Sequence, residues 1–424
     1  MIKAPLRRSG WVLADYGVSA ATNMLLTVMV ARNVTRAEFG VFAVLYGYYV
    51  LVVELSRATF SEPLLVRVSG ASRDRRNLAD SAGAAAVFGA VAATVLIPLS
   101  IMVRGGLDPA AVVLALALPG LLVQDALRVG FIAHGQAARS LANDLFWGAS
   151  QAVALVLLFT AGAGLVWALA MWAGAGLAAA VLGMAQAGVV PRCTAVRGWW
   201  RDYGRLSRPY AVEVAVIATA AYAGTLAVSV VAGVAAVGAL RAGNTLLGPV
   251  GLVCAAGRTI AISECRRAIA HSPSRLVPTM LVIGGSLATV AVCWGLVMLS
   301  LPPSLGDRLV GSSWTTARVV LPPLVAVQFV STIAMTMGGA MRALEAVREQ
   351  FTLRVLGGAL AFLGPAVGAA WYGAFGAAVG LATLNALGCV LTFLVFVRIL
   401  ARRRAENLHS PGSPVPVAEQ AEVS

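Results

Sequence analysis

Long apolar runs, separated by short polar gaps, make up most of this 424-residue chain. A helix needs roughly 20 apolar residues to cross the hydrocarbon core of a bilayer, where its backbone groups must bond to one another. The pattern predicts an all-α polytopic membrane protein of about 12 transmembrane helices, in two six-helix bundles around a central cavity. The predicted spans are residues 11–31, 40–66, 79–101, 110–132, 144–163, 165–188, 210–232, 237–262, 277–301, 319–341, 353–373 and 375–400.

The polar segments between these runs predict the domain organisation. Residues 1–190 form an N-terminal six-helix bundle, 191–209 a basic cytoplasmic linker, 210–400 a C-terminal six-helix bundle and 401–424 a disordered tail. The aromatic residues of the linker suit a membrane interface or a short amphipathic helix on the bilayer. Tight turns are predicted at two places where spans nearly abut, one from Gly162 to Leu165 and one near Gly373.

Arginine collects in every second gap between the spans. Hydrophobic residues make up 59% of the chain and charged residues 12%, too few for a soluble domain, yet the formal net charge is +14. Because cytoplasmic loops are enriched in Lys and Arg, the alternation predicts a multi-pass protein of the bacterial inner membrane with both termini cytoplasmic. The charge therefore indicates topology and attraction to anionic membrane lipids, and nucleic acid is not expected as a partner.

The polar gaps contain no reaction centre. The five cysteines form no C-x-x-C pair, and the three histidines, His134, His271 and His409, are far apart in the sequence. The largest external loop, residues 302–318, has Asp307 as its only acid. Since catalysis and metal binding need such groups gathered together, we expect no enzyme activity, no metal site and no cofactor.

Polar residues inside the spans are the candidates for function, because an ionisable group within a bilayer usually faces a cavity or a partner. They occur in spans one, two, seven and eight, the corresponding first pairs of the two halves, and predict one cavity suited to an anionic headgroup. The candidates for substrate binding are Arg241, Arg57, Asn244, Thr245 and Asn23. The candidates for coupling to an ion, a proton or sodium, are Asp15, Glu54 and Glu213.

Structural interpretations stay open beside these roles. Glu54 and Arg57 are three residues apart and can neutralise each other on one helix face. Asp15 can reach water or a loop arginine, and lone amides such as Asn23 often hydrogen-bond between helices. Arg241 has no acid within a helical turn in the sequence, which favours a position facing the cavity.

Two segments carry a family resemblance. Residues 30–47, VARNVTRAEFGVFAVLYG, resemble the first loop of polysaccharide flippases of the Wzx or PST type, with Gly40 and Phe42 at its Gly-aromatic position. Residues 234–267 are similar to that family's junction of spans seven and eight, with the pattern Gly-x-x-Arg-x-x-x-Thr-Leu-x-Gly-Pro from Gly238 to Pro249. With the twelve-span layout, the resemblance covers about residues 10–404.

The family belongs to the multidrug/oligosaccharidyl-lipid/polysaccharide (MOP) exporter superfamily. The resemblance implies a flippase or exporter that moves a lipid-linked (polyprenyl-diphosphate) oligosaccharide across the membrane by alternating access, for polysaccharide biosynthesis at the cell surface. A weak internal repeat agrees, because Gly40 and Gly238 each begin the second helix of a half. The alternative is a drug exporter or a major facilitator. Residues 70–76 are a partial match to the loop motif of the major facilitators.

Overall fold

Helices account for nearly all of the protein. The computed structural model describes residues 3–67, 75–104, 106–344 and 346–409, some side chains inside the helices excepted, and these residues contain no strand. The α-helices are α1 (Lys3–Asn33), α2 (Arg36–Ser56), α3 (Glu62–Arg67), α4 (Arg75–Arg104), α5 (Pro109–Ala133), α6 (Ala137–Thr160), α7 (Leu165–Ala187), α8 (Val196–Ala232), α9 (Val234–Leu246), α10 (Gly248–His271), α11 (Leu276–Leu299), α12 (Pro303–Val310), α13 (Trp314–Ala343) and α14 (Val347–His409).

The predicted fold class is confirmed. Among the described residues, nine helical segments are long and apolar enough to cross a membrane. Of the other predicted spans, one coincides with α1 and one with the broken pair α9 and α10, and α14 holds two predicted spans divided at Gly373. The chain is thus an all-α polytopic membrane protein with about 12 transmembrane helices.

Glycines make the two predicted tight turns. Gly162 lies between α6 and α7 with φ +72°, and Gly373 divides α14 with φ +57°, values that residues with a Cβ rarely adopt. Beyond the second turn, the two parts of α14 pack so closely that a Cβ on Gly368 would lie 2.0 Å from the carbonyl oxygen of Gly376. Both turns therefore separate antiparallel spans, as the sequence predicts.

The linker between the halves differs from the expected separate segment. Residues 196–209 are the first part of α8, which continues without a break into the seventh span. Trp199 is buried in the protein: its indole nitrogen donates to the carbonyl of Thr59 at 3.1 Å, and its ring stacks on Tyr203. Burial of these aromatic rings against the N-terminal half explains why this basic segment is an ordered helix.

The tail also differs, because α14 extends to His409 where disorder was expected from Ala401. The sequence of this extension, ARRRAENLH, is rich in Ala, Arg, Glu and Leu, which are strong helix formers. Residues 410–424, the rest of the predicted tail, lie outside the described residues.

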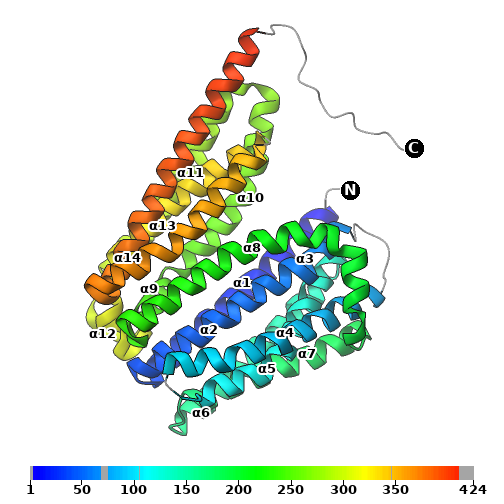
Figure 1. The fold of residues 1–424 in the computed structure, drawn as a ribbon, viewed down its shortest axis with the longest axis vertical. Helices are drawn as coiled ribbons and strands as arrows, with labels where there is room; N and C mark the ends of the chain where they lie inside the picture. Colours follow the sequence, from blue (N-terminus) through cyan, green and yellow to red (C-terminus); the bar gives the residue numbers. More distant parts are fainter. Residues whose placement is uncertain (1–2, 68–74, 105, 345, 410–424) are drawn as a thin grey trace.

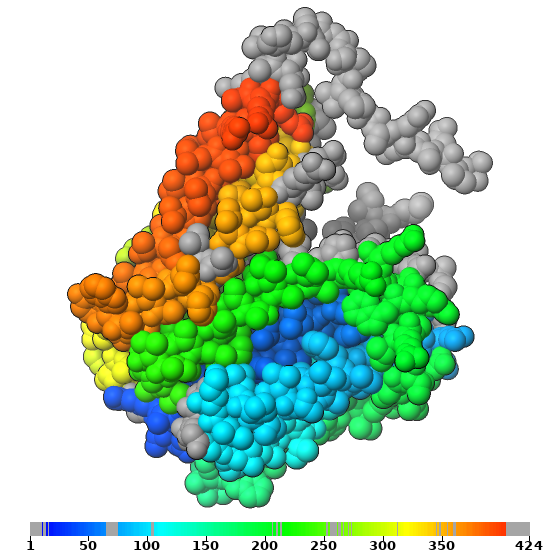
Figure 2. All heavy atoms as spheres, in the orientation of Figure 1, coloured from blue at the N-terminus to red at the C-terminus, as the bar shows by residue number. Residues whose placement is uncertain are grey.

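The helices form two bundles, α1 to α7 and α8 to α14 (Figure 1). The described chain begins and finishes at one end of the molecule, while α12 and the start of α9 lie at the opposite end (Figure 1). In the space-filling view the later part of the C-terminal half, yellow to red, projects from the N-terminal half toward the end where α14 finishes (Figure 2). We call the opposite end the α12 end.

At the α12 end the two bundles meet backbone to backbone. A Cβ on Gly40, in α2, would lie 2.0 Å from the carbonyl oxygen of Val234, in α9. A Cβ on Gly238 would lie 3.1 Å from the nitrogen of Gly40. The two glycines of the predicted internal repeat therefore lie against each other across the boundary between the halves.

Candidate functional site

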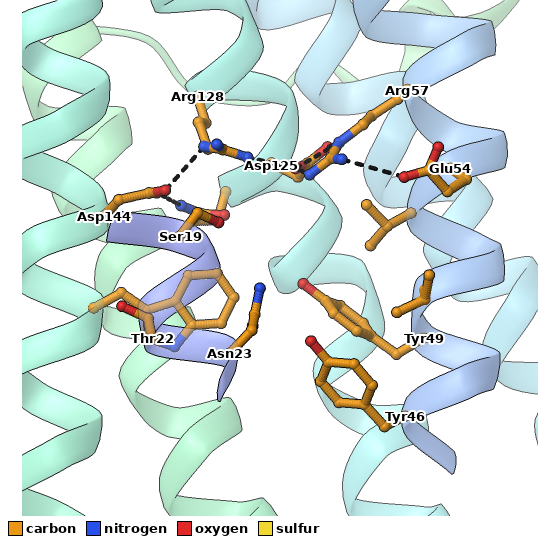
Figure 3. Close-up of a pocket in the computed structure, with 14 residues that line it drawn as sticks. Ser19, Thr22, Asn23, Tyr46, Tyr49, Glu54, Arg57, Asp125, Arg128 and Asp144 are labelled. Carbon is orange, nitrogen blue, oxygen red and sulfur yellow. Dashed lines mark hydrogen bonds and ion pairs between the residues drawn. The ribbon is translucent and has the colours of Figure 1, made fainter. Parts of the chain in front are cut away.

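A polar cavity of about 210 Å³ lies inside the N-terminal bundle, between α1, α2, α5 and α6. Charged side chains lie in a row at one end of it, and Thr22, Asn23, Tyr46 and Tyr49 point into the space beside them (Figure 3). We call it the N-bundle cavity. Its polar lining residues are Ser19, Thr22, Asn23, Tyr46, Tyr49, Glu54, Arg57, Gln124, Asp125, Arg128, Asp144 and Trp147.

Arg57 lies where α2 changes to a π-helical segment, Arg57–Ser61, before continuing as α3. Such short π-helical insertions are uncommon and often occur at functional sites. The Arg57 Nε donates to both carboxylate oxygens of Asp125, at 3.0 and 2.9 Å, and its Nη1 lies 3.4 Å from Glu54 Oε1. Asp125 is buried, whereas the Glu54 side chain is 47% exposed. Arg57 therefore joins α2 to α5 mainly through Asp125.

A second arginine, Arg128, lies one turn beyond Asp125 on α5. Its Nη2 is 2.9 Å from Asp15 Oδ2 on α1, and its Nε is 2.9 Å from Asp144 Oδ2 on α6. The Ser140 hydroxyl donates to the other oxygen of Asp15 at 2.8 Å. Arg128, Asp15 and Asp144 are all buried. One guanidinium therefore ties three helices together, the geometry that a buried charge needs in order to be tolerated.

The cluster carries more acid than base. Its carboxylates belong to Asp15, Glu54, Asp125 and Asp144, and its guanidiniums to Arg57 and Arg128. With every group ionised, the cluster has an excess of negative charge. A proton, a metal cation or an organic cation that enters the N-bundle cavity would reduce this excess of negative charge. The cluster is therefore suited to bind a cation.

Arg241 approaches this cavity from the other half of the protein. It lies on α9, where its Nη2 donates to the Thr27 hydroxyl at 3.2 Å and its guanidinium carbon lies 4.2 Å from the centre of the Tyr46 ring. Its Nε is buried without a hydrogen-bond partner. Within the described part of the chain no carboxylate pairs with Arg241.

The other predicted site residues are only partly brought together. Asn23, Glu54 and Arg57 line the N-bundle cavity, and Asp15 lies behind it, paired with Arg128. Thr245 is buried and donates to the Arg241 carbonyl, while Asn244, on the same helix, is exposed. The side chain of Glu213 lies outside the described residues.

The lining helices differ from the expectation that spans one, two, seven and eight share a cavity. In the N-bundle cavity, spans four and five, here α5 and α6, take the place of seven and eight. The reason is the charge on α5, since Asp125 and Arg128 need partners and find them on α1, α2 and α6. Asp125, Arg128 and Asp144 are not among the candidates predicted from the sequence.

A signal for these residues was present in the sequence. Asp125 and Arg128 are an acid and a base three residues apart inside the apolar run 110–132, the same arrangement as Glu54 and Arg57 in the second span. When two such spans pack together, the arginine of one pair can bind the acid of the other pair. The structure shows this arrangement, because Arg57 pairs with Asp125.

Comparison with known proteins identifies the fold. No protein-family model and no curated protein matches the sequence. Solved structures do match over nearly the whole chain. An inward-facing multidrug resistance MATE family transporter of the MOP superfamily has a TM-score of 0.68 at 13% identity, over 93% of this chain and 99% of that one.

An outward-facing MATE family transporter has a TM-score of 0.60 at 15% identity, over 95% of this chain and 96% of that one. The lipid II flippase MurJ, in an inward closed conformation, has a TM-score of 0.66 at 11% identity, over 95% and 93%. These identities are low, and what they share is architecture. The protein therefore has the two-bundle, twelve-helix fold of the MOP superfamily transporters.

Proposed function

We propose that the protein is a transporter of the inner membrane that moves a lipid-linked (polyprenyl-diphosphate) oligosaccharide across the bilayer by alternating access. The fold supports the transport part of this proposal, since it is shared with drug exporters and a lipid II flippase. The proposed orientation, with both termini in the cytoplasm, rests on the alternation of arginine along the chain.

The environment of Arg241 is the observation that supports a diphosphate-containing substrate. This arginine is a cation within a membrane span, at the boundary between the halves, with neutral partners and a buried Nε that donates to nothing. A guanidinium presents five donors in a planar fork that matches the paired oxygens of phosphate. A diphosphate would supply the charge and the acceptors that Thr27 and Tyr46 do not.

The N-bundle cavity supports the remaining parts of the proposal. Its aromatic and amide side chains, Tyr49, Trp147 and Asn23, suit the hydroxyls and apolar faces of a sugar. Its excess of carboxylates suits a coupling cation, and Glu54 is the candidate open to such an ion because its side chain is half-exposed. Asp15, also a candidate, already has Arg128 and Ser140 as partners.

A drug exporter is the second candidate function. The observation in its favour is the same excess of negative charge beside aromatic side chains, which suits an organic cation. The two candidate functions differ in their need for Arg241 at the boundary between the halves. Binding of a cationic drug gains nothing from this arginine, whereas binding of a diphosphate depends on it.

Export by cells carrying single variants separates the candidates. In a strain that lacks the protein, lipid-linked oligosaccharide is expected to accumulate on the cytoplasmic leaflet, and the wild-type gene restores export. Arg241→Ala should lower export without lowering the amount of protein in the membrane, and Arg241→Lys should rescue partly because it keeps the charge but loses the fork. Arg201→Gln, at an exposed arginine of α8, is the control.

The opposite result is equally clear. If deletion raises sensitivity to cationic drugs, leaves lipid-linked oligosaccharide unchanged and is rescued by Arg241→Ala, the glycan function is wrong and the drug exporter stands. If Arg241→Ala abolishes membrane insertion while Arg241→Lys restores it, the arginine has a structural role.

A further inference from the structure

The side chain of Arg241 bridges the two halves of the protein. The arginine belongs to α9 in the C-terminal half, and its two partners belong to the N-terminal half, Thr27 to α1 and Tyr46 to α2. Tyr46 is buried and lies beside the N-bundle cavity (Figure 3). The contact is therefore both a connection between the bundles and part of the wall of the candidate site.

This bridge lies one helical turn from the closest approach of the halves. Gly238 precedes Arg241 by three residues on α9, and its backbone lies against Gly40 of α2. Tyr46 lies farther along the same α2 helix, so the glycine contact and the arginine contact join the same two helices. Any movement that separates α2 from α9 at the α12 end must break the contact of Arg241 with Tyr46.

The partners of Arg241 hold it weakly compared with what an anion offers. One hydroxyl and one aromatic face accept from a group with five donors, and the Nε is left without a partner. Charge-assisted hydrogen bonds to phosphate oxygens are stronger and geometrically matched to the fork. A diphosphate at the boundary between the halves, beside Tyr46, would therefore compete with Tyr46 and Thr27 for the guanidinium.

We propose that Arg241, Tyr46 and Thr27 form a latch, which holds α9 against α1 and α2 when substrate is absent and which a diphosphate group releases by binding the guanidinium. This inference rests on the proposed function for the identity of the anion, but the latch itself does not. A ligand shifts a conformational equilibrium only by its different affinity for the two states. Here the difference arises because Arg241 is free to bind the anion fully only after it leaves Tyr46.

The distance between the bundles at the α12 end reports whether the latch is closed or released. Spin labels at Thr160, at the end of α6, and Ser304, in α12, report on the two halves from exposed positions. They are introduced as cysteines in a background without the five native cysteines, and the protein is reconstituted in lipid nanodiscs. Without ligand, wild type should show mainly the short distance. Tyr46→Leu should raise the population of the long distance by about three- to thirtyfold, the range that a cation–π contact predicts.

Two further variants test the same contact. Thr27→Val keeps the shape of the side chain, removes the acceptor and should shift the populations in the same direction, which keeps the latch testable if Tyr46→Leu folds poorly. Phe131→Leu is the control. It removes a buried aromatic ring of α5, inside the N-terminal half and away from α9, and should leave the distance unchanged.

Inorganic pyrophosphate at millimolar concentration is the probe for release. It should raise the long-distance population in wild type and have no further effect in Arg241→Ala. If Tyr46→Leu and Thr27→Val fold and leave the distances unchanged, the latch is wrong whatever pyrophosphate does. If both variants shift the distances but pyrophosphate leaves wild type unchanged, release by a diphosphate is wrong and the proposed substrate class loses its support.

Discussion

Arg128 and Asp15 form a buried ion pair that links α5 to α1, with Nη2 and Oδ2 2.9 Å apart. The arginine is 5% exposed and the aspartate is completely buried. The same guanidinium also holds Asp144 on α6. A single positive charge therefore pairs with carboxylates from two neighbouring helices and fixes the position of α1 in the N-terminal bundle.

Removal of this charge should destabilise the N-terminal bundle. Arg128→Met leaves two buried carboxylates without their cation, and breaking a buried pair in this way typically costs about 3–5 kcal/mol. We expect a lower thermal unfolding midpoint of the detergent-solubilised protein and less protein in the membrane. Arg201→Met, at a side chain that is 82% exposed, is the control and should change the stability by less than about 1 kcal/mol. Equal midpoints for the two variants would contradict a structural role of Arg128.

Glu54 and Asp125 should respond differently to neutralisation, although both contact Arg57. Asp125→Asn leaves the Arg57 guanidinium without its closest partner and should destabilise the protein by about 3 kcal/mol or more. Glu54→Gln removes a longer contact at a half-exposed side chain and should cost less than about 1 kcal/mol. Thermal unfolding tests the stability difference.

Transport assays then separate a coupling role of Glu54 from simple neutralisation of Arg57. If Glu54 couples transport to an ion, Glu54→Gln should fold normally and lose the dependence of transport on the gradient of protons or sodium. Normal, gradient-dependent transport by Glu54→Gln would rule out Glu54 as the coupling residue.

The number of spans and the glycine turns could be predicted because they depend on local properties. A run of apolar residues marks a span, and Gly162 and Gly373 mark breaks between runs. The partners of charged residues could not be predicted in this way. Arg57 and Asp125 are 68 positions apart, and Arg128 and Asp15 are 113 apart, so their contacts depend on which helices pack together. Glu54 is the partner of Arg57 that lies in the same span, but the packing of α2 against α5 brings the better-buried Asp125 closer to it.

The same limit applies to α8. Its arginines, Trp199 and Tyr203 have the composition of a membrane-surface linker, and nothing local reveals that the Thr59 carbonyl, 140 positions away in the sequence, accepts from the indole. The pattern predicts a linker at residues 191–209, whereas residues 196–209 are helical in the structure and are held by this tertiary contact.

Gly40→Ala should prevent the contact between α2 and α9 at the α12 end. The added methyl carbon would lie 2.0 Å from the backbone oxygen of Val234. A backbone atom cannot move aside as the end of a flexible side chain can. We expect a longer distance between spin labels at Thr160 and Ser304. Gly285→Ala is the control, because a Cβ there meets nothing within 4 Å and should slightly stabilise α11. An unchanged distance in a folded Gly40→Ala protein would show that this contact does not set the conformation.

Thiol labelling tests the orientation in the membrane. Cysteines at Gly106 and Gly198 would occupy open positions, since a Cβ at either one meets nothing within 4 Å. With both termini cytoplasmic, an impermeant reagent added to intact cells should label Gly106→Cys and not Gly198→Cys. Permeabilised cells should show labelling at both positions. Labelling of Gly198→Cys in intact cells would reverse the proposed orientation.

The α8 helix makes the connection between the halves an ordered element. It contains 37 residues, Trp199 fixes its first part to the N-terminal bundle, and its remainder belongs to the C-terminal bundle. Pro209 lies within the helix at the boundary between these two parts, and a proline inside a helix favours a bend. Gly233, with φ +84°, directly follows its last residue. Movement of one half relative to the other therefore has to bend or tilt α8. A chain cut at exposed Val190 would leave α8 intact and allow the two pieces to reassemble, whereas a cut at Gly204 would divide the helix.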